Sequence, residues 1–306
     1  MAGWQGFHPV VARADGLPDT GGTEAANPGL KPPDQPWMKP CMQCIKLASL
    51  AALAALAALA LTAALPARVQ AQEPASSVAF SIGVVSDYRY RGISQTRLKP
   101  AVQGGVDYAG PGGLYLGAWA STIQWIKDAE GDARFELDLY GGFKGEISKD
   151  LTYDIGVLAY LYPSAGTSKW DAIYKSPNTT EIYGALTFGT VTGKLSYAAT
   201  NLFGNYDFAK RKGSKGSLYF DLSSSFDLGG GLMLAPHVGY QKVSDISNAS
   251  YTDYSLTLSR DFSGLVPSIA LVGTNADKTF YVPGAAANSS KFLGKSAVVV
   301  GVKYNF

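Results

Sequence analysis

Cysteine is nearly absent from this sequence. Among 306 residues only Cys41 and Cys44 are cysteines, and both precede an Ala- and Leu-rich run. Disulfides, thiol chemistry and cysteine-rich metal centres are therefore excluded after that run. Histidine is also scarce, with two residues in the chain, so the sequence predicts no soft-metal site and indicates no cofactor.

The chain also lacks an excess of charge of one sign. It has 26 Lys and Arg residues against 24 Asp and Glu residues. Nucleic-acid-binding domains usually carry a clear basic excess, so we expect no nucleic-acid partner. The glycine-rich stretches GGLYLG and DLGGG lack the Lys-Ser/Thr pair of a phosphate-binding loop.

A single long hydrophobic run occurs, at residues 47–65. Lys39 and Lys46 lie before it, and Val-Gln-Ala ending at Ala71 follows it. A basic start, an apolar middle and a small-x-small end are typical of a secretory signal peptide, with cleavage expected between Ala71 and Gln72. A retained transmembrane anchor is the alternative, because the run is about long enough to cross a bilayer.

These features divide the chain into three parts. Residues 1–37 are rich in Pro and Gly without periodicity, which predicts a disordered leader and a start codon assigned too far upstream. Residues 38–71 are the predicted signal peptide, which the secretion translocon would use. Residues 72–306 are the predicted mature domain.

The predicted mature domain is dominated by short segments in which apolar and other residues alternate. In 133–145, for example, Phe135, Leu137 and Leu139 alternate with Arg134, Glu136 and Asp138. Alternation with period two is typical of β-strands. About twelve strands are predicted, at 78–90, 101–108, 114–121, 133–145, 151–162, 180–188, 193–200, 217–226, 232–241, 253–260, 266–274 and 297–306.

The connections between these segments alternate between short and long. Five are short and rich in turn residues, such as AGPGG and DLGGG, and six are longer. Bacterial outer-membrane barrels have short periplasmic turns and long extracellular loops. The sequence therefore predicts an all-β fold, a transmembrane up-and-down antiparallel β-barrel preceded by a cleavable signal peptide. Its apolar faces would contact lipid, and its location would be the outer membrane.

Some features leave details of the barrel open. Pro236 and Pro267 fall inside predicted strands, where proline removes a hydrogen bond, so ten or fourteen strands remain alternatives to twelve. Aromatic residues near strand ends are expected in the membrane interfaces. They are Tyr88, Tyr108, Tyr153, Tyr162, Tyr304 and Phe306, of which Tyr304 and Phe306 are also the expected C-terminal signal for the barrel-assembly machinery.

Several stretches resemble a known family. SDYRYRGISQT, KPAVQGGVDY, GLYLGAWAS, FELDLYGGFKGE, YDIGVLAYLYPSA and TEIYGAL together resemble the TorF-type porins of Gram-negative bacteria, over about residues 78–306. The resemblance implies an outer-membrane barrel with a pore. It implies neither a particular solute nor any catalytic residue.

The main functional hypothesis is a channel for passive diffusion of small hydrophilic solutes or ions. Ionisable residues at membrane depth are costly unless they contact water or one another, which indicates a wet or ion-paired lumen. The predicted pore-lining residues are Asp87, Arg89, Asp107, Arg134, Glu136, Asp138, Lys144, Asp154, Glu181, Lys194, Asp221, His237 and Lys303.

Three alternatives remain open at this point. The lumen charges could form a closed salt-bridged plug, and residues 275–296 could fold inward. The barrel could be a hydrolase of lipid or lipopolysaccharide, although His237 is predicted to face the lumen and no enzyme is expected. It could also be an adhesion barrel that binds through Trp125, Trp170 and Tyr174.

The expected partners follow from the predicted location. They are outer-membrane lipids, small solutes and lipopolysaccharide, whose phosphates would lie near the basic loop residues Lys210, Arg211, Lys212 and Lys215. A plainly solvated loop is the alternative for these four residues.

Overall fold

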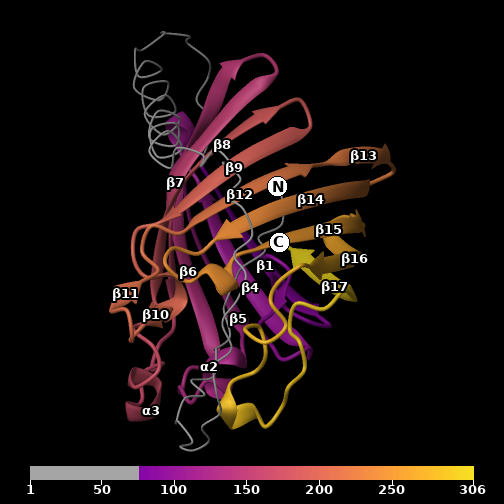
Figure 1. Cartoon of the computed structure of the whole chain (residues 1–306). Helices are drawn as coiled ribbons and strands as arrows, with labels where there is room; N and C mark the ends of the chain where they lie inside the picture. Colours follow the sequence, from indigo (N-terminus) through magenta and orange to yellow (C-terminus); the bar gives the residue numbers. More distant parts are fainter. Residues whose placement is uncertain (1–75) are drawn as a thin grey trace, which may run out of the picture. The chain divides into compact units, whose positions relative to one another are not determined.

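The structure, a computed structural model, describes residues 76–306. The predicted leader, the signal peptide and the Ala71–Gln72 cleavage site lie outside the described residues. The described chain forms a closed antiparallel barrel of twelve strands, in which β12 and β13 follow one another as one interrupted strand (Figure 1). The strands are β1 (Ser77–Val85), β4 (Ala101–Ala109), β5 (Leu114–Thr122), β6 (Phe135–Ser148), β7 (Leu151–Leu161), β8 (Thr179–Phe188), β9 (Val191–Ala198), β12 (Leu218–Ser224) with β13 (Phe226–Gly229), β14 (Leu232–Lys242), β15 (Tyr251–Arg260), β16 (Leu265–Thr274) and β17 (Ala297–Asn305).

Each strand pairs with its neighbour in the sequence, and pairing between β1 and β17 closes the sheet. The up-and-down barrel predicted from the alternation is confirmed, including the count of twelve. Closure matters because a sheet edge in lipid would leave backbone groups without hydrogen bonds. None of the helices within residues 76–306 has the length and apolar character needed to cross a bilayer.

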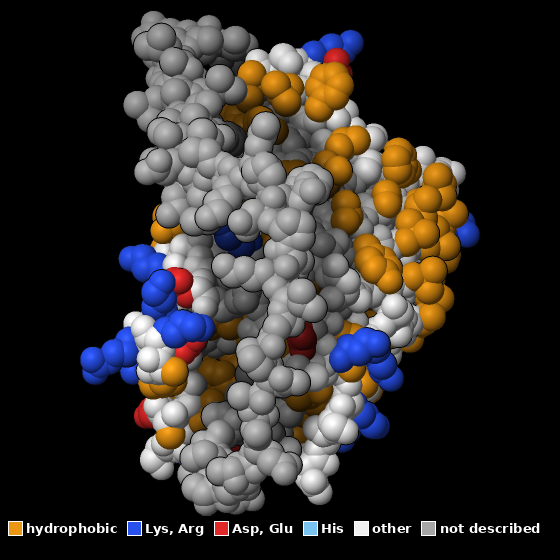
Figure 2. Space-filling model, in the orientation of Figure 1, with side chains coloured by type: hydrophobic (Ala, Val, Ile, Leu, Met, Phe, Trp, Pro, Cys, Tyr) orange, Lys and Arg blue, Asp and Glu red, His pale blue; other side chains and the backbone are white. Residues whose placement is uncertain are grey.

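The alternation of the sequence becomes the two faces of the barrel wall. Phe80, Ile269 and Val300 point outward and are about half exposed, whereas Glu136 and Glu181 point inward and are buried. Figure 2 shows many outward hydrophobic side chains on the right, over the strands labelled β13 to β17 in Figure 1. An apolar exterior around a polar interior is the arrangement of a membrane barrel.

All short connections lie at one end of the barrel and all long ones at the other. Short turns follow β4, β6, β8, β13 and β15, while long loops follow β1, β5, β7, β9, β14 and β16. In the turn after β13, Gly231 has a φ of 77°, and a Cβ there would lie 2.6 Å from the carbonyl oxygen of Asp261. Glycine is required at this position because other residues rarely adopt that conformation.

The long loops contain short elements of their own. In Figure 1 they lie at the lower end, where α2, α3, β10 and β11 are labelled. The remaining elements of the described chain are β2 (Arg89–Tyr90), β3 (Ile93–Ser94), η1 (Pro111–Gly113), α2 (Trp125–Asp128), α3 (Ser168–Asp171), η2 (Leu202–Gly204), β10 (Tyr206–Asp207), β11 (Lys212–Gly213), η3 (Ser247–Ala249) and η4 (Ala285–Ala287). All of these except η1 belong to long loops.

The two prolines that the pattern left open lie where the ladder is already interrupted. Pro236 is opposite the break between β12 and β13, where the Ser225 N–H bonds to the Thr190 carbonyl instead. Pro267 lies in β16 beyond Ser268, the residue at which its pairing with β15 stops. Both prolines therefore lie beside an interruption of one ladder, while each remains paired with the strand on its other side, Pro236 with Leu256 of β15 and Pro267 with Val302 of β17.

Candidate functional site: a plugged lumen

The loop after β1 folds into the barrel. We call residues 86–100 the plug. Most of its residues are buried, and Ile93 and Gln95 are fully buried. The long loops of a barrel normally extend away from the membrane, whereas this loop lies inside the barrel at the long-loop end.

Aromatic residues of the plug contact one side of the barrel wall. The Tyr88 ring packs edge-on against Trp119 of β5 at 5.4 Å, and its hydroxyl donates to Glu136 of β6 at 3.3 Å. The hydroxyls of Tyr90 and Tyr160 of β7 are hydrogen-bonded at 2.8 Å. These contacts fix the plug against three consecutive strands.

Arg91 connects the plug to the opposite wall of the barrel. Its guanidinium donates to Glu181 of β8 at 2.8 Å and to Gln241 of β14 at 2.5 Å, and it lies 3.7 Å from the centre of the Tyr219 ring of β12. These three strands lie on the far side of the barrel from β1. We call Glu181, Tyr219 and Gln241 the arginine site. Arg91 has a φ of 42°, a strained conformation for a non-glycine residue.

Arg89 ties the plug to the loop that precedes β17. It forms an ion pair with Asp87 at 2.5 Å and donates to the carbonyl oxygens of Leu293 and Lys295 at 3.1 and 3.0 Å. Tyr281 of the same loop is fully buried against Tyr251. Residues 275–296 therefore cover the plug, in agreement with the inward-folding alternative.

The loop after β5 also contacts the plug. The N–H groups of Gln124 and Trp125 donate to the Gln95 carbonyl at 2.9 and 3.2 Å, and Arg97 forms an ion pair with Asp128. In the last long loop, the Thr279 hydroxyl and the N–H groups of Phe280 and Thr279 hold the pKa of Asp277 below its usual value.

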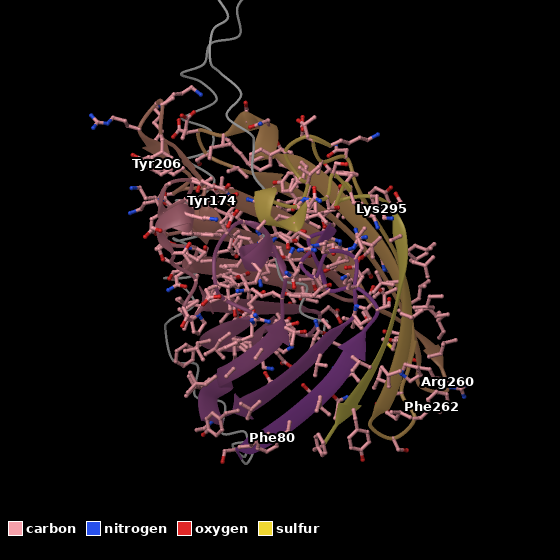
Figure 3. All side chains as sticks on the ribbon, turned by 90° about the horizontal axis from the view of Figure 1, so that it is seen from below. Phe80, Tyr174, Tyr206, Arg260, Phe262 and Lys295 are labelled. Atoms are coloured by element: carbon pink, nitrogen blue, oxygen red, sulfur yellow. The ribbon has the colours of Figure 1, made fainter. Side chains whose placement is uncertain are left out.

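The half of the lumen nearest the short turns is more open. Figure 3 labels Tyr174, Tyr206 and Lys295 at the loop end, where the side chains are crowded, and Phe80, Arg260 and Phe262 at the turn end, where they are sparser. The inward residues Asp107, Lys144 and Lys303 are exposed. We call this half the vestibule.

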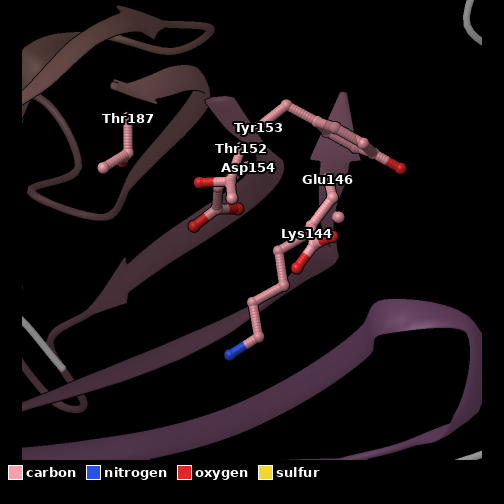
Figure 4. A pocket seen from close by; sticks show the side chains of 7 residues that line it. Lys144, Glu146, Thr152, Tyr153, Asp154 and Thr187 are labelled. Carbon is pink, nitrogen blue, oxygen red and sulfur yellow. The ribbon is translucent and has the colours of Figure 1, made fainter. Parts of the chain in front are cut away.

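A cavity of about 310 Å³ lies in the vestibule wall at the β6–β7 hairpin (Figure 4). Lys144 and Glu146 of β6 and Asp154 of β7 contribute its charges, with Thr152 and Thr187 as neutral polar groups. A lining of both charge signs together with hydroxyls is suited to water and small polar solutes.

Four inward tyrosines each lie close to a glycine of the wall. Tyr140 lies over Gly117, Tyr115 over Gly142, Tyr183 over Gly156 and Tyr219 over Gly239. Three of the rings also donate to wall carboxylates: Tyr140 to Asp107 at 2.6 Å, Tyr115 to Asp154 at 2.5 Å and Tyr219 to Asp253 at 3.2 Å. A side chain in place of the glycine would push the ring into the lumen.

The variant Gly117→Ala tests this arrangement. Its Cβ would overlap the Tyr140 ring, so the ring must move and lose its hydrogen bond to Asp107. We expect the free energy of unfolding to fall by about 1–3 kcal/mol, the usual cost of overpacking. A urea titration of the folded barrel in lipid vesicles measures it.

Gly193→Ala is the matched control, because a Cβ at Gly193 meets nothing within 4 Å. If both variants lost the same free energy of unfolding, the effect would come from the strand backbone and not from the contact between Gly117 and the Tyr140 ring.

His237 faces the lumen, as predicted from strand parity. Its Nε2 lies 2.6 Å from Asp221 Oδ2 and 3.0 Å from the Tyr219 hydroxyl, and its Nδ1 lies 3.7 Å from Asp253. Among the hydrogen bonds recorded within residues 76–306, none joins His237 to a serine. This geometry is not that of a serine-hydrolase triad, which needs the histidine next to the nucleophile.

The structure gathers most of the predicted pore-lining residues inside the barrel. Buried inward residues of the strands are Glu136, Asp138 and Glu181, and partly exposed ones are Asp154, Lys194, Asp221 and His237. Asp107, Lys144 and Lys303 face the vestibule. No cluster of three or more possible metal ligands occurs in the described part of the chain.

Three of the predicted positions need correction. The first strand was expected to reach residue 90, but β1 ends at Val85, so Asp87 and Arg89 belong to the plug rather than to the wall. Arg134 is exposed and precedes β6. The alternation of SDYRYR resembles a strand, but its side chains find partners inside the barrel instead of a neighbouring strand.

The predicted roles of several aromatic residues were also wrong. Trp125, Trp170 and Tyr174 are buried in a cluster between two loops, with 5.6 Å between the two Trp ring centres, so they are not exposed for adhesion. Tyr88 and Tyr162 are buried and do not reach the membrane interface. The basic residues Lys210, Arg211, Lys212 and Lys215 are exposed, as expected.

Sequence reasoning missed four residues of the site: Arg91, Tyr219, Gln241 and Asp253. Strand parity could have found Tyr219 and Gln241, which share a face with Asp221 and His237 respectively. It could also have found Asp253, since Tyr254 and Leu256 on the same strand face outward. Arg91 had no such signal, because its position depends on how the loop folds.

Comparison with known proteins assigns the chain to a family. Residues 71–306 match a family model described as "Bacterial protein of unknown function (Gcw_chp)". The chain belongs to the Gcw_chp family. This match does not test the TorF-type resemblance, which remains a prediction, and comparison with curated proteins gives no match.

Solved structures with a similar chain path are outer-membrane porins. The KdgM porin is 9% identical to this chain, with a TM-score of 0.45. The matched region covers 76% of this chain and 99% of the KdgM chain. The NanC porin is 10% identical, with a TM-score of 0.46 and coverages of 75% and 99%. OccAB3 from Acinetobacter baumannii is 14% identical, with a TM-score of 0.36 and coverages of 76% and 65%. At these TM-scores the similarities do not bear on the function of this chain.

Proposed function

We propose that this Gcw_chp protein is an outer-membrane channel for passive diffusion of small hydrophilic solutes or ions, and that the plug closes it in the present structure. The closed barrel and its apolar exterior support the location, because both are needed in lipid. The water-exposed vestibule supports passage on the turn side.

The observation that carries the proposal is the way the plug is held. Arg91 binds Glu181 and Gln241, and Arg89 binds backbone carbonyls of another loop. These polar contacts can be exchanged for water when the loop moves out, whereas Tyr88, Tyr90 and Ile93 of the plug would have to leave a buried hydrophobic cluster. Left-handed backbone at Arg91, Arg97 and Leu98 adds strain of roughly 1 kcal/mol or more at each residue, which release of the plug could relieve.

The partners in this proposal are those expected of such a protein. The exposed Lys210, Arg211 and Lys215 are available to lipopolysaccharide phosphates on the loop side. Tyr304 and Phe306, both exposed and in edge-to-face contact at 5.0 Å, are available to the barrel-assembly machinery. The TorF-type resemblance fits the same proposal.

Replacing residues 86–100 by a short turn tests the function. Val85 and Ala101 pair directly across β1 and β4, so a tight turn can join them without changing the register. In planar bilayers we expect the unaltered protein to be mostly closed and the shortened one to show sustained conductance steps. Replacing the exposed tip residues 208–211 by Gly and Ser is the control and should leave the closed behaviour unchanged.

The result that contradicts the proposal is a shortened barrel that stays silent. Far-ultraviolet circular dichroism and heat-modifiable mobility on gels show whether that barrel is folded. A folded, silent barrel would mean that the wall itself, and not the plug, closes the lumen.

A further inference from the structure

Charges in the buried part of the lumen are divided between the wall and the plug. In the part of the chain that the structure describes, the barrel strands contain four buried Asp and Glu residues, Glu136, Asp138, Glu181 and Asp253, and no buried Lys, Arg or His. The two buried bases, Arg89 and Arg91, both belong to the plug. The wall also has Lys194 and His237, but both are partly exposed, and His237 lies between Asp221 and Asp253.

Removal of the plug would therefore leave an acidic constriction. Arg91, which pairs with Glu181 of the wall, would leave with the plug, whereas Arg89 is paired with Asp87 of the plug itself, so its departure does not change the charge of the wall. Rings of Asp and Glu side chains favour cations in channels, because a pore of low dielectric concentrates the counter-ion.

The arginine site has the components that recognise a guanidinium or ammonium group. Glu181 accepts from Arg91 at 2.8 and 3.1 Å, Gln241 Oε1 accepts at 2.5 Å, and the Tyr219 ring lies 3.7 Å from the guanidinium carbon. A carboxylate, an amide oxygen and an aromatic face together bind such a cation well. All three belong to the wall, so they remain when the plug leaves.

A second acidic position lies nearby on β6. Asp138 is 3% exposed, and its Oδ1 has no hydrogen-bond partner among the described residues. Glu136 is its neighbour on the same inward face and is fully buried. An unpartnered carboxylate oxygen in a buried polar wall is expensive unless a cation or a donor can reach it.

We propose that the wall beneath the plug selects cationic solutes, and that Arg91 occupies the place which a guanidinium or primary ammonium group of a solute takes once the plug has moved. This inference rests on the proposed channel function. It adds a class of solute, namely small organic cations. Inorganic cations would pass as well, because the same carboxylates attract them.

Reversal potentials of the barrel shortened at residues 86–100 test the selection. Under a KCl gradient, we expect the reversal potential to shift toward the potassium equilibrium potential. Adding Glu181→Gln and Asp138→Asn to the shortened barrel should remove most of that shift, whereas Glu130→Gln, in an exposed loop ion pair with Lys169, should leave it in place. Conductance without cation preference, or with anion preference, overturns the proposal.

A binding measurement separates this inference from the channel function. In the full-length variant Arg91→Ala, ethylguanidinium should fill the emptied arginine site and raise the melting temperature, while the neutral ethylurea should not. In Arg91→Ala/Glu181→Gln the rise should be lost. If no barrel conducts but ethylguanidinium stabilises in this pattern, the channel function fails and the cation site stands. If ethylguanidinium and ethylurea act alike, the cation site is wrong whatever the conductance.

Discussion

The variant Ile269→Lys is expected to lose about 2–4 kcal/mol of folding free energy in lipid vesicles, the cost of a lysine at the midplane on the lipid face of a barrel. Ile269 lies in the middle of β16 and is about half exposed on the outer face, level with Val300 of β17. A charge there would contact hydrocarbon. Urea titration of the refolded barrel in vesicles, followed by tryptophan fluorescence, measures the loss.

The neighbouring variant Ser268→Lys is the control. Ser268 is on the inner face of the same strand, opposite Gly301, and a lysine there can reach the water of the vestibule. We expect this change to alter stability by less than about 1 kcal/mol, as is usual for polar substitutions in a wet environment. Equal losses from both variants would contradict the assignment of the outer face to lipid.

The variant Arg91→Ala is expected to open the channel. Both partners of the Arg91–Glu181 ion pair are more than nine-tenths buried, and truncating Arg91 leaves the Glu181 charge without its guanidinium. Removing one partner of a buried pair destabilises by about 3–5 kcal/mol. About 3 kcal/mol acting on the closed state alone would shift the ratio of closed to open barrels by roughly 100-fold. Open probability in planar bilayers measures the shift.

The double variant Arg91→Ala/Glu181→Gln separates the ion pair from the loss of side-chain volume. Glutamine is neutral, so the unpaired buried charge is gone, and we expect the open probability to fall back part of the way. Lys210→Ala, which removes an exposed ion pair with Asp207, should leave it unchanged. If Arg91→Ala remains as closed as the unaltered protein, Arg91 does not hold the plug.

The barrel architecture was predictable because successive residues of a strand face lipid and lumen in turn, so the alternation of apolar and polar residues is visible in the sequence. The alternation at Phe135–Asp138 and at Val298–Val302 separates an outer from an inner face, and turn residues mark where each hairpin ends. The contrast between five short and six long connections then set the class and the direction of the strands. Pro236 and Pro267 are unfavourable in a strand by local criteria. Both are nevertheless compatible with the barrel, because each lies beside an interruption in the pairing with one neighbouring strand.

The same local pattern misled at one point. SDYRYR alternates like a strand, and the sequence offers no reason to end β1 at Val85. The ending is decided by partners far away in the chain: Glu181 lies 90 residues from Arg91, and Gln241 lies 150 residues from it.

The sequence alone thus determined which segments become strands, which face of each is apolar and at which end the long loops lie, since each of these depends on neighbouring residues. Only the tertiary structure decided that the first loop enters the lumen and that its Arg91 pairs with Glu181 of the wall. That outcome depends on which side chains the closed barrel brings together across its interior, and residue spacing along the chain contains no record of it.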